Sequence, residues 1–347
     1  MPFLQQMDKG STAVEYWEKA IELDSMNSNA FITLGNYYYK QNKLERAITY
    51  WLASMISMPE EPTSNLNLAI AYSQKEYYME AFRFYERYLK FAQDKTNEKY
   101  LEIKNKIEKN KKLANDYIKL GIQYQSNNDN KSALMCYKRS ASYCPIFSKS
   151  HLNIGSLYYM DQNYEQAIRY WTNAYYLDPN YPKIINNLAI SYDILKQFDY
   201  AFCYYTRYLK YIQSKPIELE KINTRCNKIK PILNENPYLV TKHLEKAQDA
   251  FSKCDYYKAL DEFKNYIILN PLEQEKYIEQ IIKIENFLSP DKHVIENCIL
   301  QGRKTMEQDR DFAKAKKYFA RILVLAPQTS QEYQEAKVKL SICLQQS

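Results

Sequence analysis

An internal period of 34 residues constrains the fold of this chain more than any other feature. The segment from Ser28 reads SNAFITLGNYYYKQNKLERAITYWLASMISMPEE, and the segment from Ser148 reads SKSHLNIGSLYYMDQNYEQAIRYWTNAYYLDPNY. Both contain a Gly, a Tyr pair, an Ala-Ile pair, a Tyr-Trp pair and a Pro in the same order. A fixed period of this length indicates one supersecondary unit repeated along the chain.

An alanine that opens the second helix marks each unit, and an aromatic residue follows it by four positions. Successive alanines are separated by 34, 34, 52, 34, 34, 58 and 56 residues. The alanines are Ala13, Ala47, Ala81, Ala133, Ala167, Ala201, Ala259 and Ala315. The aromatics, which we expect in the core, are Trp17, Trp51, Tyr85, Tyr137, Trp171, Tyr205, Phe263 and Phe319.

A small residue stands twelve positions before five of these alanines, at Gly35, Ala69, Gly121, Gly155 and Ala189. Glycine inside a helix costs about 1 kcal/mol relative to alanine, so we expect two helix backbones to approach closely there. A proline twelve positions after the alanine is expected to end the second helix. These prolines are Pro59, Pro145, Pro179, Pro271 and Pro327.

This pattern resembles the tetratricopeptide repeat (TPR) family, whose period is about 34 residues. The resemblance implies an all-α, helix-turn-helix solenoid wound as a right-handed superhelix, here interrupted by extra capping helices. Two C-terminal units depart from the pattern. One has Ala250 where an aromatic is expected, and Gly302 of the other is displaced by one residue.

The long gaps contain helical inserts, at residues 99–112 and 219–230, which resemble the solvating helix that covers the last repeat of a TPR array. Residues 28–94 align without gaps to residues 148–214 with 24 identities in 67 positions, which indicates a duplicated block. We therefore predict three modules. They are residues 1–112, with a truncated first repeat and a capping helix, residues 113–234, a duplicate with its own capping helix, and a degenerate module at residues 235–347.

The start of the chain lies part-way along the first helix expected for the unit of Ala13. We therefore expect the natural chain to extend upstream, through a linker and a membrane anchor. The sequence has no apolar run of about eighteen residues, and MPFLQQMDKG is not a signal peptide. We expect a soluble protein, cytoplasmic by default and periplasmic if an upstream anchor or signal was removed.

Candidate partner-binding residues follow from the resemblance, since TPR arrays bind partners on the concave wall formed by their first helices. The inward position two residues before the small residue is Asn67, Asn153 and Asn187. An Asn amide can bond both the N–H and the C=O of an extended peptide. Lys183, one turn before Asn187, would meet a carboxylate. Ordinary polarity of a helix surface is the alternative interpretation.

The family's carboxylate clamp, which grips acidic chaperone tails, is not favoured. Of its five positions only Asn153 and Lys183 match, while Ile118, Ile122 and Asn187 occupy the others. A peptide-binding co-chaperone is nevertheless one alternative function. An RNA-associated helical-repeat protein is another, motivated by the net charge of +7. Because 48 basic residues are interspersed with 41 acidic ones, solvated helix faces are favoured over a nucleic-acid surface.

Tyrosine occurs 35 times, and one recurring set indicates a core position. This set is Tyr38, Tyr72, Tyr124, Tyr158 and Tyr192. We expect surplus tyrosines to line surfaces suited to protein contact. Examples are Tyr37, Tyr39, Tyr175, Tyr176 and Tyr204.

Enzyme motifs such as GxxxxGK, GxGxxG, GxSxG and HExxH do not occur, so we expect no catalysis, cofactor or small-molecule substrate. Seven Cys without a CxxC pair indicate reduced thiols, and three widely spaced His argue against zinc. The composition, rich in Lys, Asn, Ile and Tyr, is typical of AT-rich bacterial genomes. It resembles in style the TPR scaffolds of the spirochaete periplasmic flagellar collar. The hypothesis is a scaffold in a multiprotein assembly, with envelope and motility machines as candidates.

Overall fold

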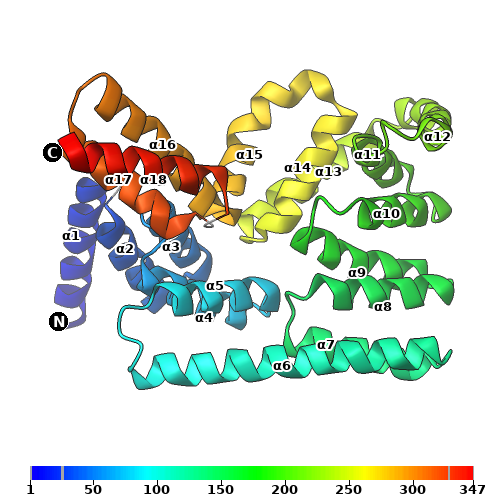
Figure 1. Cartoon of the computed structure of the whole chain (residues 1–347), viewed down its shortest axis with the longest axis horizontal. Helices are drawn as coiled ribbons and strands as arrows, with labels where there is room; N and C mark the ends of the chain where they lie inside the picture. The colour runs from blue at the N-terminus through cyan, green and yellow to red at the C-terminus, as the bar shows by residue number, and fades with distance from the viewer. Residues whose placement is uncertain (1, 25–26, 327–328, 347) are drawn as a thin grey trace. The chain divides into compact units, whose positions relative to one another are not determined.

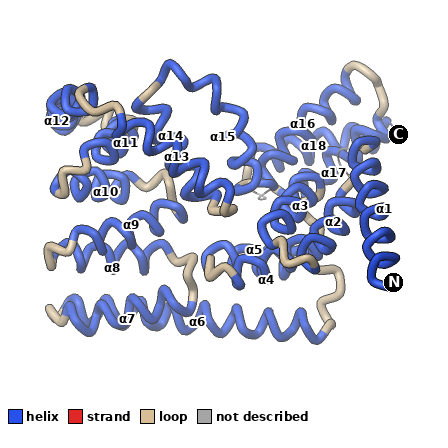
Figure 2. The backbone as a smooth tube through the Cα atoms, turned by 180° about the vertical axis from the view of Figure 1, so that it is seen from behind, coloured by secondary structure: helices blue, strands red, loops and turns tan. Residues whose placement is uncertain are grey.

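The computed structural model describes residues 2–24, 27–326 and 329–346, and all regular elements in these ranges are helices (Figure 2). The first helices of the repeated pairs are α2 (Ser28–Lys40), α4 (Pro62–Gln74), α6 (Glu98–Ser126), α8 (Ser148–Met160), α10 (Pro182–Ile194), α13 (Tyr238–Ser252) and α16 (Pro290–Glu307). Their second helices are α3 (Leu44–Ser57), α5 (Tyr78–Phe91), α7 (Asn130–Tyr143), α9 (Tyr164–Leu177), α11 (Phe198–Leu209), α14 (Tyr256–Leu269) and α17 (Phe312–Leu325). The remaining elements are α1 (Pro2–Leu23), α12 (Pro216–Asn234), the short 3-10 helix η1 (Pro271–Glu273), α15 (Gln274–Leu288) and α18 (Gln331–Gln346).

The same turn joins the two helices in each of these pairs. Five residues before each alanine from Ala47 to Ala315 stands a non-glycine residue in the left-handed region, with φ between 51° and 62°. That conformation costs roughly 1–2 kcal/mol for a residue with a β-carbon, so packing of the two helices must hold it. The seven residues are Asn42, Glu76, Asn128, Gln162, Lys196, Cys254 and Arg310.

The ends of the helices follow the sequence pattern. In four of these turns, the residue after the left-handed one is the N-cap of the second helix. Its side chain accepts a hydrogen bond from the backbone N–H three residues later. These N-caps are Asp129, Asn163, Asp255 and Asp311. Helices α3, α7, α9 and α14 each end two residues before the predicted proline. Pro327 lies outside the described residues.

The first marked unit is one continuous helix in the described residues, with no turn before Ala13. Helix α1 runs from Pro2 to Leu23 without a turn. It packs directly on α2, where Trp17 meets the edge of the Tyr37 ring at 6.1 Å between centroids. Ala13 and Trp17 are only partly buried, since α1 is not paired with another helix of the same unit.

In the four pairs whose small residue is a glycine, that glycine admits the aromatic ring of the second helix, whereas the sequence predicted a close approach of two backbones. A β-carbon added at these glycines would lie under 3 Å from a ring atom, a distance that real β-carbons do not reach. The distance from the added β-carbon to the nearest ring atom would be 2.4 Å for Gly35 and Trp51, 2.6 Å for Gly121 and Tyr137, 2.5 Å for Gly155 and Trp171, and 2.9 Å for Gly302 and Phe319. Gly302 therefore plays the repeat's role despite its displacement.

The recurring tyrosine of the first helix stacks on an aromatic ring of the second helix twelve residues later. Ring centroids lie 5.3 to 5.8 Å apart, and the ring planes are within 17° of parallel. The pairs are Tyr38 with Tyr50, Tyr72 with Phe84, Tyr158 with Tyr170, and Tyr192 with Tyr204. This position is therefore part of the packing between the two helices.

The chain forms two compact units, whose boundaries differ from those of the three predicted modules. Unit 1 contains Met1–Ala71, Lys90–Ala92 and Ile282–Ser347, and unit 2 contains Tyr72–Leu89 and Gln93–Ile281. In unit 1, α16 packs against α3. The Arg321 guanidinium there donates to both carboxylate oxygens of Glu60, at 2.9 and 3.1 Å, and to the Ser57 carbonyl at 2.9 Å. The three modules stay a prediction about sequence duplication.

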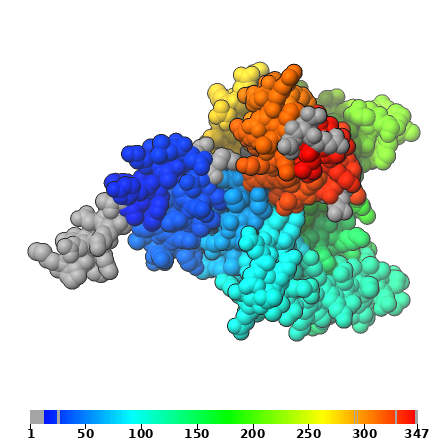
Figure 3. Space-filling view, turned by 60° about the vertical axis from the view of Figure 1, so that its left-hand side comes forward, coloured from blue at the N-terminus to red at the C-terminus, as the bar shows by residue number. Residues whose placement is uncertain are grey.

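In unit 2 the pairs α6/α7, α8/α9 and α10/α11 stack in chain order (Figure 1). The insert at 99–112 is continuous with the next first helix, so the predicted boundary at residue 112 falls inside α6. Helix α6 reaches the molecular surface (Figure 3), where Lys104 and Glu108 face each other at 4.0 Å. The second insert forms α12, which buries Ile222 and Ile229 against the α10/α11 pair.

Candidate functional site

The predicted inward asparagines occupy equivalent positions, each two residues before the small residue of a first helix. Asn67 lies in α4, Asn153 in α8 and Asn187 in α10, and all three are partly buried. Lys183, in the first turn of α10, is exposed. Unit 2 thus carries Asn153, Lys183 and Asn187 on consecutive first helices, while Asn67 belongs to unit 1.

Asn67 is engaged by a neighbouring side chain. Its Nδ2 donates to Asn36 Oδ1 at 3.0 Å, and the same oxygen accepts the Trp51 indole N–H at 3.2 Å. One amide hydrogen of Asn67 therefore already serves the packing of α2, α3 and α4.

Asn153 lies beside the core aromatic of the preceding pair. Burial raises the pKa of Tyr137, and the hydrogen bond from Asn153 to the phenol oxygen opposes that rise. The Tyr137 hydroxyl donates to Gln125 Oε1 at 2.9 Å. The amide of Asn153 therefore marks the junction between the α6/α7 and α8/α9 pairs.

A hollow of about 540 Å³ lies where the last residues of α10 meet α12. Asp193 lines it and is held by Arg225, whose Nε donates to Oδ2 at 2.7 Å, and by the Tyr205 hydroxyl at 3.2 Å. Lys221 and Lys228 are exposed at its rim. Helix α12 thus supplies basic side chains beside the end of α10.

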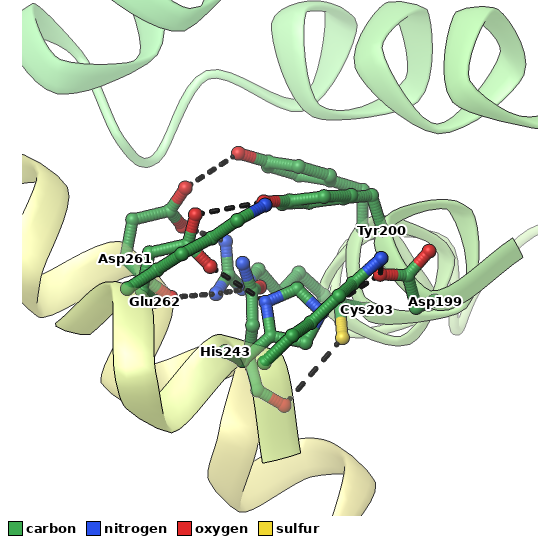
Figure 4. A network of polar contacts seen from close by, with 11 residues as sticks. Asp199, Tyr200, Cys203, His243, Asp261 and Glu262 are labelled. Carbon is green, nitrogen blue, oxygen red and sulfur yellow. Dashed lines mark hydrogen bonds and ion pairs between the residues drawn. The ribbon is translucent and has the colours of Figure 1, made fainter. Parts of the chain in front are cut away.

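A buried polar network joins α11 to α13 and α14 within unit 2 (Figure 4), and the sequence interpretation missed it. One face of α11 contributes five of its members. They are Asp199, Tyr200, Cys203, Tyr204 and Arg207. This face carries charged and hydroxyl groups where a packed helix normally presents apolar residues.

His243 of α13 is the centre of one half of the network. Its side chain is fully buried, with Nδ1 2.6 Å from Glu262 Oε2 and Nε2 3.0 Å from Asp199 Oδ2. Lys242 Nζ lies 2.6 Å from the same Asp199 oxygen. The Tyr200 hydroxyl donates to Glu262 Oε1 at 2.8 Å. Both carboxylates are therefore bonded to donors from two directions.

Arg207 and Asp261 form the other half. Arg207 NH1 donates to Asp261 Oδ1 at 2.5 Å, and NH2 donates to Asn265 Oδ1 at 2.8 Å. The Tyr204 hydroxyl donates to Asp261 Oδ2 at 2.8 Å. Burial alone would lower the pKa of Arg207, but Asp261 outweighs it and raises the pKa. The guanidinium therefore stays charged inside the protein.

The surplus tyrosines predicted to line protein-contact surfaces pack instead within the chain. Tyr175 meets Tyr204 edge-on at 5.6 Å between centroids, and Tyr176 stacks on Tyr257 of α14 at 5.7 Å. Tyr37 contacts Trp17, and Tyr39 contacts Trp51. A surface of α9 and α11 that looked available to partners is covered by α14.

The spacing of polar residues along α11 and α14 was the sequence signal that could have predicted this network. Asp199, Cys203 and Arg207 recur every four residues, as do Asp261 and Asn265, so each set lies on one helix face. All seven Cys side chains are buried. Burial raises the pKa of the Cys144 thiol to about 12.

Two further observations concern the parts of the chain that the structure describes. None of their helices is long and apolar enough to cross a membrane. No group of three or more His, Cys, Asp or Glu side chains within these ranges is placed to hold a metal ion.

Comparison with known proteins finds similar solved structures, but no protein-family model and no curated protein match the sequence. YrrB, a TPR protein with an unusual peptide-binding site, is 17% identical over 61% of this chain and 99% of its own, with a TM-score of 0.29. The TPR domain of P58(IPK) is 13% identical over 99% of this chain and 96% of its own, with a TM-score of 0.38. The TPR2AB domain of yeast Sti1, in complex with pHSP90, is 16% identical over 66% of this chain and 95% of its own, with a TM-score of 0.30.

At these identities and TM-scores the similarity by itself supports no conclusion about this chain. The chain's own features carry the assignment: the 34-residue pattern, the glycine that admits an aromatic ring, and the repeated left-handed turn. The described part of this chain is built from α-helix pairs of the tetratricopeptide type.

Proposed function

We propose that this protein is an interaction scaffold that binds extended segments of partner proteins along the first helices of unit 2. The observation that carries the proposal is the placement of Asn153 and Asn187 at one repeat position on consecutive first helices, both partly exposed. An amide side chain offers a donor and an acceptor, which matches the peptide backbone whatever its sequence. Exposed Lys183, one turn before Asn187, would pair with a carboxylate of the partner.

Asn67 has the same role in a separate stretch of unit 1, with one hydrogen already given to Asn36. Two isoleucines, Ile118 and Ile122, stand where the family's carboxylate clamp needs polar side chains, and Ile122 is exposed. An apolar side chain in the bound segment fits this part of α6 better than an acidic tail does. The co-chaperone alternative therefore has less support than a general scaffold.

The wider setting that we propose is a multiprotein assembly of a bacterial envelope or flagellar motor, in which no catalysis is required of this chain. Composition supports it, since the chain is rich in Lys and Tyr and has only five Gly. The number of helix pairs also supports it, because an array of pairs offers several surfaces to different partners.

A peptide library displayed on phage and selected against the full chain tests the proposal. Affinities of the selected peptides are then measured by fluorescence anisotropy for wild type and for Asn153→Ala/Asn187→Ala. Each lost hydrogen bond is worth about 0.5–1.5 kcal/mol, so the double variant is expected to bind at least about fivefold more weakly. Lys183→Ala is expected to weaken only peptides that contain a carboxylate.

The matched control is Asn223→Ala, since Asn223 is exposed on α12 and lies outside the proposed surface. Equal binding by the double Asn variant and wild type would show that the first helices do not capture the backbone. The RNA alternative makes a different prediction, salt-dependent retention of RNA in filter binding. The scaffold proposal expects none.

A further inference from the structure

The contact of α13 and α14 with α11 depends on a histidine that is bonded to carboxylates through both ring nitrogens. His243 Nδ1 faces Glu262 of α14 at 2.6 Å, and Nε2 faces Asp199 of α11 at 3.0 Å. A neutral imidazole has one donor and one acceptor, while an ionised carboxylate only accepts. Both contacts are hydrogen bonds only when the ring carries both protons, so the geometry is that of an imidazolium.

Among the groups in direct contact with one another at the ring, the imidazolium and the Lys242 ammonium balance the two carboxylates, Asp199 and Glu262. Asp199 also binds Lys242 Nζ at 2.6 Å, and Glu262 also accepts from the Tyr200 hydroxyl. Lys246 Nζ donates to that Tyr200 oxygen at 2.8 Å, at the exposed edge of the network. The neighbouring Arg207–Asp261 ion pair is balanced by itself.

Removing one proton from this buried site leaves a ring nitrogen lone pair facing a carboxylate oxygen. Asp199 and Glu262 are 1% and 5% exposed, so water cannot replace the lost donor. A buried acceptor without a donor carries its full desolvation penalty, and a buried ion cluster that loses one member is strongly destabilised.

We propose that the contact between the α13/α14 pair and α11 is a proton-dependent latch, closed while His243 is an imidazolium and loosened when the ring loses a proton. Its opening uncovers the face of α11 that α14 now covers. There the Tyr204 hydroxyl is bonded to Asp261, and the Cys203 thiol lies 3.6 Å from the Asn265 carbonyl oxygen. The inference does not rest on the proposed peptide-binding function.

The direction of the pH dependence follows from the same contacts. Burial opposes the charged ring, but the hydrogen bonds to Asp199 and Glu262 outweigh it and raise the pKa of His243 above 6.5. Its contribution to stability is therefore complete below about pH 6.5 and is lost as pH rises through the folded-state pKa. Burial also opposes the charged form of Asp199 and Glu262, but the hydrogen bonds to His243 outweigh it and lower the pKa of both carboxyl groups. Their contribution to stability is therefore lost only in acid.

Titratable groups at the other end of the same helix pair act in the same direction. The Tyr72 hydroxyl donates to the Cys254 carbonyl in the α13–α14 turn at 3.4 Å, and Arg83 of α5 lies over the Tyr257 ring at 5.0 Å. Burial raises the pKa of Glu80 to about 7, and the charge of Asp255 adds to the rise. Deprotonation of Glu80, which accompanies a rise in pH through about 7, therefore weakens this end of the α13/α14 pair as well.

Nuclear magnetic resonance of the wild-type chain tests the latch directly, because only three His contribute imidazole signals. One signal is expected to titrate clearly above pH 6.5. Amide hydrogen exchange, corrected for intrinsic rates, is then compared at pH 6 and one unit above that pKa. Protection in α11, α13 and α14 is expected to fall at least tenfold, while protection in α7 and α8 stays the same. A His243 signal that titrates at or below 6.5, or unchanged protection, overturns the latch.

Two variants separate the latch from general destabilisation. His243→Gln cannot become charged, so it is expected to show low protection in α11, α13 and α14 at both pH values. The control is His151→Asn, because His151 is also buried but bonds the Pro145 carbonyl at 2.7 Å, as Asn65 bonds Pro59 at 3.1 Å in an earlier repeat. This control is expected to keep the wild-type pH response. A His243→Gln chain that keeps that response contradicts the proposal, and if it does not fold the wild-type titration decides.

Discussion

The Trp171 indole lies so close to Gly155 that a β-carbon on the glycine would be 2.5 Å from the ring atom Cδ1. Trp51 and Gly35 show the same relationship at 2.4 Å, one duplicated block earlier in the sequence. The indole N–H of Trp171 donates to the Leu152 carbonyl at 3.1 Å, which fixes the ring across the first helix. The missing carbon of the glycine thus sets how closely the two helices of the pair pack.

We expect Gly155→Ala to destabilise the protein, although alanine is the better helix former by about 1 kcal/mol. The added methyl group must displace a ring that is 2% exposed, and overpacking of this kind costs about 1–3 kcal/mol. Urea unfolding followed by circular dichroism measures the change. Ser156→Ala, on the next residue of the same helix and only partly buried, serves as the control. A more stable Gly155→Ala protein would show that the ring yields easily.

We expect Arg207→Met to cost about 3–5 kcal/mol, because it leaves the buried Asp261 carboxylate without its charge partner. Urea unfolding measures the loss, with Arg303→Met as the control. Arg303 binds both carboxylate oxygens of Glu335 at 2.8 Å, but half of its side chain is exposed, so about 1 kcal/mol or less is expected. Similar losses in the two variants would mean that burial of the Arg207 pair does not matter.

We expect Glu80→Gln to raise stability above neutral pH and to change little near pH 4.5. Burial raises the pKa of Glu80 from 4.5 to about 7, so the folded state holds a proton that the unfolded chain releases. The penalty grows between these two pH values and then stays constant. Thermal melts at pH 4.5, 7 and 8.5 follow it, with the exposed Glu165→Gln as control. A pH-independent effect would place Glu80 in contact with solvent.

Much of the fold is visible in the sequence because its determinants are local. The alanine, the aromatic four residues later and the proline after the second helix all lie within one unit of 34 residues. Helix pairs, their turns and their ends follow from these spacings. The reason for the small residue does not follow from them. The spacing of sixteen residues between Gly155 and Trp171 does not indicate whether a helix backbone or an aromatic ring occupies the space beside the glycine.

The candidate binding residues could be located from the sequence, because each asparagine occupies the same position within its repeat. Their partners were not visible, because Asn67 meets Asn36, which belongs to another repeat 31 residues away. The continuous helix α1 was also not expected. Ala13 and Trp17 match the sequence pattern of the helix pairs, but that pattern alone does not place a turn before Ala13.

The sequence by itself determined that this protein is made of helix pairs with one repeated turn, because each pair is stabilised by contacts within a single unit. Only the tertiary structure decided where the α13/α14 pair attaches. Arg207 and Asp261 are 54 residues apart, and His243 and Asp199 are 44 apart. In sequence such charged residues are indistinguishable from those of a solvated helix face. Their burial and pairing depend on which helices meet, and that is a property of the folded chain alone.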